Sequence, residues 1–420
     1  MTRRIPATGI NLFQLIYVLM DEYTQRTGQK PLNLSLGNPD GIPASQILEV
    51  KARFAKDPGY DFHTYAEDKN LNRFCEGMIE VHTGLKLEEH PHLKAVPIAG
   101  IKTATALMPL ACGMHLPDRT RREKFTVVSN APAYDVIGTW STSYLGTKRV
   151  VWPLSSQDNM RLNLDRLKAA LTEAQVDRPD LVFVIRPGNP AATGASKEEW
   201  KKLIEFCIER GSRLVNDAAY VGLADPAKHT SLASVAKDYP ELEWAEMYSV
   251  SKSFNDPGAR LGCMIGSKEF IEDFTLIKGN TDSGPVPSVM AAYGQLFQDV
   301  KLARKILGDL RQMYDDRLRY LVPQLKKAGF QPACETDAGF FTLWKTPRSV
   351  FGIDLAKKSK ETGTPIHELF NRTVISETGI VGVHFMSDEP LIRYAVCTDV
   401  LNPEFQSRFE SQLQRLQIQM

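Results

Sequence analysis

The sequence predicts an α/β fold, in which a large domain has a mostly parallel central sheet covered by helices and a smaller α+β domain is appended. A strand–helix–strand unit in the middle of the chain is the first observation behind this prediction. The apolar runs Leu181–Ile185 and 213–215 flank a helix that starts at a Ser196/Glu199 capping box and ends at Gly211. Two further strand-like runs fit the same sheet, residues 125–129 and 247–251.

A change of pattern after about residue 287 is the second observation. A long helical stretch over 288–328, with a break expected near 307–308, gives way to alternating strand-like and helical segments. We therefore expect a large domain over 44–290, and a small domain formed by 1–43 together with 291–420.

Charge and hydropathy exclude several classes of protein. The 420 residues carry 51 basic and 50 acidic side chains, a net charge of +1, which gives no footprint for nucleic acid or an anionic membrane. The apolar stretch from Ile10 to Met20 is interrupted by Asn11 and Gln14 and is followed by Asp21. This pattern indicates an amphipathic helix and neither a signal peptide nor a membrane span.

The six cysteines are scattered, and none forms a C-x-x-C pair. This spacing favours reduced thiols packed as small apolar groups, a cytoplasmic location, and no metal site.

Chemically active side chains follow the predicted strands. Asn189 follows the strand 181–185, Asp217 and Tyr220 follow the next, and Lys252 and Tyr134 follow two others. In open α/β sheets, ligands bind outside the carboxyl ends of the strands, so we expect these side chains to gather at one edge.

Pyridoxal phosphate (PLP) is the ligand that fits this set. An amine such as that of Lys252 condenses with an aldehyde to give a Schiff base, and an ionised carboxylate such as Asp217 keeps a pyridine nitrogen protonated. A flat aromatic ring can stack on the cofactor ring, and an amide and a phenol can donate to its oxygen. An arginine and serines can hold the phosphate.

With these residues the chain resembles the class I and II aminotransferases, which are PLP enzymes of fold type I, and the resemblance spans nearly the whole chain. Ser249-x-Ser251-Lys252 followed by Arg260 and Gly262 is similar to the S-x-S-K…R-x-G signature of that family. The resemblance implies that Lys252 holds the cofactor and that Ser249, Ser251 and Arg260 hold its phosphate.

Other motifs carry further roles by the same resemblance. Asn189, Asp217 and Tyr220 match the Asn…Asp-x-x-Tyr set that contacts the ring, and Tyr134 is implied to stack on it. Three residues outside this set complete the site, Gly37 near the substrate, Arg393 on its α-carboxylate, and Tyr65 on the phosphate held by the partner subunit of a homodimer.

The phosphate is also expected at a helix N-terminus, where N–H groups and the helix dipole favour an anion. The sequence "AGIKTATAL" fits, with Gly100 allowing close approach and with the amides of Ile101 and Lys102 opening the helix. With Lys102 in its first turn, this phosphate loop resembles that of the diaminopimelate-type branch of the family. One departure is the loop Asn189–Gly194, which has one residue more than the usual N-P-T-G and whose path the sequence leaves open.

These residues predict a PLP-dependent aminotransferase that moves an amino group between an amino acid and a 2-oxo acid by a ping-pong mechanism through a Lys252 Schiff base. A β-lyase or another PLP enzyme of the same fold is the first alternative, and a non-enzymatic, aminotransferase-like regulatory module is the second. A dinucleotide-dependent dehydrogenase is disfavoured, because no G-x-G-x-x-G opens a βα unit. The donor and acceptor, and whether a dicarboxylic substrate is accepted, are not predicted.

Overall fold

The computed structural model describes residues 12–116 and 124–420, so the first two residues of the expected N-terminal helix, Ile10 and Asn11, lie outside the described residues. The chain divides into two compact units. The small unit comprises the chain up to Gly37, Asp315–Ala333 and Phe340–Met420, and the large unit comprises Asn38–Tyr314 and Cys334–Gly339.

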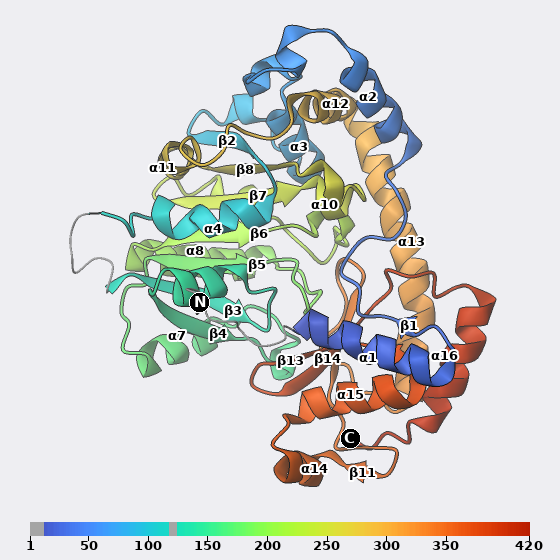
Figure 1. Ribbon diagram of the computed structural model, residues 1–420. Coiled ribbons are helices and arrows are strands. Elements are labelled where there is room, and N and C mark those ends of the chain that lie inside the picture. The colour runs from blue at the N-terminus through green and yellow to red at the C-terminus, as the bar shows by residue number, and fades with distance from the viewer. Residues whose placement is uncertain (1–11, 117–123) are drawn as a thin grey trace, which may run out of the picture. The chain divides into compact units, whose positions relative to one another are not determined.

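A seven-stranded sheet forms the centre of the large unit in the order β2-β8-β7-β6-β5-β3-β4 (Figure 1). Strand β8 is antiparallel to both of its neighbours, and the other pairs are parallel. The mostly parallel α/β fold expected from the sequence is thereby confirmed. The strands are β2 (Leu93–Ile98), β3 (Thr126–Ala131), β4 (Lys148–Pro153), β5 (Leu181–Ile185), β6 (Arg213–Asp217), β7 (Trp244–Ser249) and β8 (Gly262–Ser267).

Helices cover both faces of this sheet (Figure 1). The α8 helix is the one expected after β5, and its Ser196/Glu199 capping box and its left-handed Gly211 are both present. The helices of the large unit are α2 (Ser45–Lys56), α3 (Phe74–Thr83), α4 (Ile101–Ala111), α6 (Val136–Thr139), α7 (Leu164–Glu173), α8 (Lys197–Arg210), α9 (Leu232–Ala236), α10 (Val250–Ser253), α11 (Lys268–Lys278) and α12 (Pro287–Gln298).

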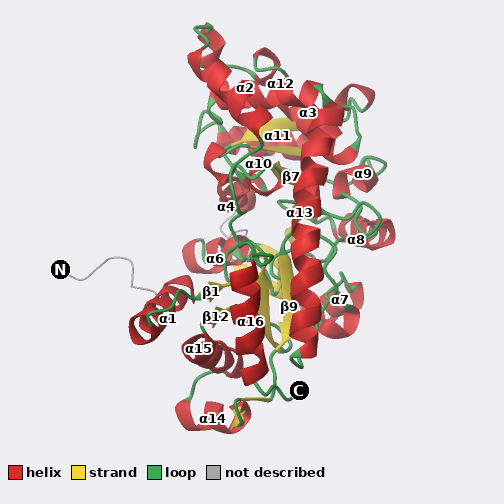
Figure 2. Cartoon of the chain, turned by 90° about the vertical axis from the view of Figure 1, so that its right-hand side faces the viewer, coloured by secondary structure: helices red, strands yellow, loops and turns green. Residues whose placement is uncertain are grey.

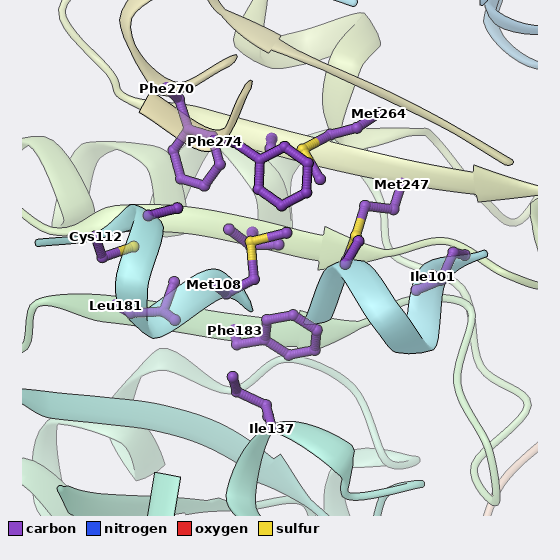
Figure 3. Close-up of a cluster of buried hydrophobic side chains, with 14 of the residues drawn as sticks. Ile101, Met108, Cys112, Ile137, Leu181, Phe183, Met247, Met264, Phe270 and Phe274 are labelled. Atoms are coloured by element: carbon purple, nitrogen blue, oxygen red, sulfur yellow. The ribbon is translucent and has the colours of Figure 1, made fainter. Parts of the chain in front are cut away.

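One face of the sheet packs against α4 and α11 through a buried apolar cluster (Figure 3). Met108 of α4 and Phe274 of α11 meet Phe183 and Met247 of the strands there. Because successive side chains of a strand point to opposite faces, the residues between these strand positions face the other side of the sheet. The side chains on that other face lie on the α8 and α9 side of the sheet and form a layer that is polar in part.

The small unit contains a three-stranded antiparallel sheet in the order β13-β14-β9 and a parallel pair, β1 with β12. The α1 helix packs on α15 through Ile16, which is buried against Ile375 and Val383 (Figure 2). The strands are β1 (Leu32–Asn33), β9 (Phe341–Lys345), β10 (Ser349–Val350), β11 (Ile353–Asp354), β12 (Ile380–Val381), β13 (Val383–Met386) and β14 (Pro390–Ala395). The helices are α1 (Leu12–Thr27), α14 (Leu355–Thr362), α15 (Ile366–Thr378) and α16 (Pro403–Arg415).

The long helical stretch after residue 287 breaks at Asp299, and the break expected near residues 307–308 was wrong. Two helices result, α12 and α13 (Val300–Lys327), and Gly308 lies inside the second. The carboxylate of Asp299 accepts the N–H of Leu302 at 3.0 Å, which makes it the N-cap of α13 and explains the position of the break. The division between the two units falls within α13, after Tyr314.

Among the described residues, no helix is both long enough and apolar enough to cross a membrane.

Candidate active site

Lys252 lies just beyond the carboxyl end of β7. The strand ends at Ser249, whose hydroxyl accepts the N–H of Ser251 at 3.1 Å and caps the short helix α10. The same hydroxyl lies 2.8 Å from that of Ser251. The sequence suggested a strand as far as residue 251, but this cap turns the chain two residues earlier and places half-buried Lys252 on a helical turn.

Asp217 is the last residue of β6, and it lies level with Ile185 of β5 and Met247 of β7 in the sheet register. Burial raises the pKa of its carboxyl group to about 6, and a hydrogen bond from the N–H of Ala219, 3.0 Å away, offsets this only in part. A cationic partner, such as a protonated pyridine nitrogen, would restore an ordinary pKa to this carboxyl group.

Tyr220 follows three residues later and is buried. The segment of Gly339 lies against its ring, where a Cβ added at Gly339 would be 3.3 Å from Cδ1 of Tyr220. This packing fixes the ring near the end of β6.

Asn189 and Tyr134 are joined directly, because the N–H of Tyr134 donates to the carbonyl of Asn189 at 2.8 Å. Asn189 is buried, whereas the ring of Tyr134 is 44% exposed and so has a face available for stacking. The Nζ of Lys102 lies 3.3 Å from the hydroxyl of Tyr134, so the first turn of α4 belongs to the same group of residues.

Gly100 and Arg260 approach each other closely. Gly100 has a φ of +95° and is the N-cap of α4, whose first helical residues are Ile101 and Lys102. A Cβ at position 100 would lie 2.5 Å from Nη2 of Arg260, so a larger residue there would displace the guanidinium, and the positive φ itself favours glycine. A guanidinium beside the N–H groups of a helix N-terminus is a suitable environment for a phosphate.

The loop Asn189–Gly194, whose path the sequence left open, is fastened at its far end. The Nη1 of buried Arg186 reaches the carbonyl and the hydroxyl of Thr193, and its Nη2 donates to the carbonyl of Met160 at 2.7 Å. The N–H of Gly194 donates to Asp337 at 3.1 Å. The extra residue is thus accommodated in a loop that is held at several points.

In the small unit, Gly37 and Arg393 lie together. A Cβ at Gly37 would lie 4.0 Å from Nη1 of Arg393, whose Nη2 donates to the carbonyl of Ser35 at 2.5 Å. The guanidinium carbon of Arg393 is 4.3 Å from the centroid of the Phe341 ring and 5.7 Å from that of Phe385. These contacts hold a fully buried guanidinium in one orientation.

Tyr65 lies between two short 3₁₀ helices of the large unit and is 84% exposed.

Sequence reasoning missed a buried polar cluster made by Asn216, Glu246 and the backbone of Arg186. Its signal was an asparagine within the predicted strand, after Leu214 and Val215 and directly before Asp217.

The residues present in the large unit fit PLP. They provide the amine of Lys252, the half-buried carboxyl group of Asp217 with its raised pKa, the exposed ring of Tyr134, and the close contact of Gly100 with Arg260 at a helix N-terminus. This donor set matches an aldehyde, a pyridine ring and a phosphate, which are the three parts of that cofactor.

Comparisons with known proteins agree with this fit. The family model for aminotransferase class I and II matches residues 30–396. An LL-diaminopimelate aminotransferase from Methanococcus maripaludis is 30% identical over 371 residues, which cover 87% of this chain and 81% of that protein. One of the same name from Methanocaldococcus jannaschii is 28% identical over 369 residues, which cover 87% of this chain and 80% of that protein.

Solved structures show the same fold. A double mutant of Thermus thermophilus aspartate aminotransferase aligns with a TM-score of 0.76 at 18% identity, covering 98% of this chain and 99% of that chain. A probable N-succinyldiaminopimelate aminotransferase from the same organism gives a TM-score of 0.76 at 18% identity, covering 96% and 99%. The chain therefore belongs to the class I and II aminotransferases and is a PLP-dependent transaminase of fold type I.

Proposed function

We propose that this transaminase holds PLP at the carboxyl edge of the large sheet, with Lys252 as its covalent anchor and Asp217 at its ring nitrogen. The placement of Lys252 and Asp217 at the carboxyl ends of the neighbouring strands β7 and β6 carries the proposal. The raised pKa of Asp217 supports it, because a cationic ring partner would favour the ionised carboxylate. The remaining contacts are assigned as follows: Asn189 and Tyr220 donate to the ring oxygen, Tyr134 stacks on the ring, and the phosphate is held by the amides of Gly100, Ile101 and Lys102 together with Ser249, Ser251 and Arg260.

Bound PLP supplies a ring that accepts electrons from the substrate Cα. The chain supplies the proton transfers and the orientation. Arg393 grips the α-carboxylate of the amino acid with two parallel hydrogen bonds, which orients the bond to the Cα proton. With PLP held through Lys252, the freed amine of this lysine would take that proton as general base and, as general acid, would deliver it to the aldehyde carbon of the cofactor and not back to Cα. Asp217 would keep a proton on the ring nitrogen.

The order of events is ping-pong, with one amino acid leaving as its 2-oxo acid before a second 2-oxo acid enters. For the first donor to test, we propose LL-diaminopimelate, the substrate in the names of the relatives at 28% and 30% identity. The ammonium group of Lys102 beside Tyr134 supports an anionic ligand at this point. Lys278, another cation of the large unit, is buried in an ion pair of 2.7 Å with Asp282, which makes it unsuitable for reading a substrate.

The working form proposed is a homodimer in the cytoplasm. Tyr65 would reach the phosphate in the partner subunit, and its exposure within one chain supports this assignment. Nearby in the sequence, Ile42 and Tyr60 are 74% and 79% exposed, and a subunit interface would cover such side chains. All six cysteines are buried and none is in a disulfide, which agrees with a reducing compartment.

The test is an assay of the PLP-loaded protein with a panel of amino donors and 2-oxoglutarate or pyruvate as acceptors. We expect amino-group exchange, with parallel double-reciprocal plots and with LL-diaminopimelate among the donors. Release of pyruvate and ammonia from one amino acid, with no exchange, would instead establish a β-lyase. If exchange occurs but LL-diaminopimelate is inert, only the substrate proposal fails.

A further inference from the structure

The polar layer beneath the site, on the α8 and α9 side of the sheet, contains the fully buried side chains of Asn216 and Glu246. They are register partners on the neighbouring strands β6 and β7. Residues next to each of them in the sequence belong to the apolar cluster. Because side chains alternate along a strand, Asn216 and Glu246 face the opposite side of the sheet. The two side chains are 2.8 Å apart, with Nδ2 of Asn216 donating to Oε1 of Glu246.

Glu246 is saturated with donors. Besides Asn216, its carboxylate accepts the N–H groups of Leu232 and Ala233 at 3.1 and 2.7 Å and the hydroxyl of Tyr248 at 2.7 Å. A buried carboxylate with this many partners has one favourable orientation. Because the carboxylate of Glu246 only accepts hydrogen bonds, it orients the Asn216 amide with its NH₂ group toward Glu246.

Asn216 uses its amide to bind the backbone of Arg186, the first residue beyond β5. Its Nδ2 donates to the carbonyl of Arg186 at 2.9 Å, and its Oδ1 accepts the N–H of Arg186 at 2.9 Å. These two bonds reinforce the backbone bond from the same Arg186 N–H to the carbonyl of Asp217 at 3.1 Å, one step past the end of β5, at the place where the chain enters the Asn189–Gly194 loop.

Arg186 transmits this restraint to the far end of the same loop. Its guanidinium binds Thr193, so both ends of the segment that carries Asn189 are tied to one buried residue. The loop is also joined to Tyr134 by the bond from the Tyr134 N–H to the Asn189 carbonyl. The side chain of Asn216 thus links Asp217, its neighbour in β6, to the loop of Asn189 and to Tyr134.

We propose that Asn216, oriented by Glu246, is a positioning residue that aligns Asp217 and Asn189 on the cofactor ring. The inference rests on the proposed function, because the ring contacts of these two residues are themselves proposed. Asn216 touches neither substrate nor cofactor in this account. Its side chain acts by fixing the relative positions of two strand ends.

The test compares Asn216→Ala with Asn371→Ala in the PLP-loaded enzyme. Asn371 is the matched control, because it is a buried asparagine of the small unit that donates to the carbonyl of Gly382 at 3.0 Å. For N216A we expect the dissociation constant of PLP to rise about tenfold, the size of loss that supporting side chains of a site cause. We also expect the pH at which the visible band of the bound cofactor changes to move upward by about half a unit or more, because a ring oxygen that loses the Asn189 bond holds a nearby proton more tightly.

The control variant N371A should lose thermal stability while keeping the wild-type PLP affinity and spectral titration. If N216A also keeps both, the inference is overturned, whatever its melting temperature. If N216A does not fold, Thr193→Val takes its place, since it removes one acceptor of Arg186 with little change of shape, and the same two measurements decide. The wild-type spectrum distinguishes failure of this inference from failure of the proposed function, because a wild type that does not bind PLP would contradict the proposed function itself.

Discussion

Gly100 and Arg260 meet so closely that a Cβ on residue 100 would lie 2.5 Å from Nη2 of the arginine. The Gly100→Ala variant should therefore displace the guanidinium and strain a backbone whose φ is +95°. We expect the dissociation constant of PLP to rise about tenfold or more, measured by fluorescence titration of the apoprotein, since charge-assisted phosphate contacts are worth about 1.5–3 kcal/mol each.

The control for that variant is Gly146→Ala, which has a φ of +64° and no atom within 4 Å of an added Cβ. The G146A variant strains a backbone with positive φ, but its added Cβ crowds no neighbouring atom. Equal PLP affinity in G100A and G146A would show that the contact with Arg260 does not matter for the phosphate.

Arg393→Lys keeps the charge in the small unit but loses the planar pair of donors. We expect kcat/KM for the amino acid to fall about 100-fold, as the loss of a bidentate carboxylate contact would cause, with the PLP spectrum unchanged. Arg317→Lys is the control, because Arg317 is a buried arginine of the same unit that binds the carbonyl of Val396. A similar loss in both variants would remove the special role of Arg393.

Asp217→Asn should separate stability from catalysis. In the apoprotein the carboxyl pKa is raised from 3.8 to about 6, so the ionised form is disfavoured by folding. The loss of folding stability caused by the ionised Asp217 is absent below pH 4, grows between pH 4 and 6, and stays constant above pH 6, where it reaches at most about 3 kcal/mol.

We therefore expect apo D217N to be more stable than the wild-type apoprotein in urea unfolding at pH 7, and the difference to vanish near pH 4. PLP affinity and turnover should fall in the same variant, because the ring nitrogen loses its carboxylate. A wild-type apoprotein that is the more stable of the two at pH 7 would contradict this account of Asp217.

Tyr65 can be tested by subunit complementation. Tyr65→Ala and Lys252→Ala should each be inactive, or nearly so, as homodimers. Mixed dimers place both defects in one site and leave the other site intact, so random mixing should restore about a quarter of the wild-type activity. Complete absence of recovery in mixtures shown to contain mixed dimers would place Tyr65 and Lys252 in the same subunit's site.

Much of the fold followed from local patterns in the sequence. The apolar run of β5 predicted a strand, and the Ser196/Glu199 pair predicted where α8 begins, because both signals act over a few residues. The signal for the break at Asp299 is also local, because its carboxylate caps the first turn of α13, whereas Gly308, where a break was expected, lies inside that helix.

The network around Asn216 could not be predicted in the same way. Its bonds join residues 186, 216 and 246, and these distant segments meet only through the register of three strands. Hydrophobic periodicity identifies strands but does not specify which residues of different strands lie side by side. The left-handed φ of Arg260 and its approach to Gly100 depend likewise on the folded sheet.

The most direct test of the account is borohydride reduction of the PLP-loaded protein followed by peptide mass analysis. We predict a visible absorbance band that borohydride abolishes, together with a mass increase equal to one reduced cofactor on the peptide that contains Lys252. An unmodified Lys252, with the cofactor mass on another lysine or on none, would contradict the claim that this amine is the anchor.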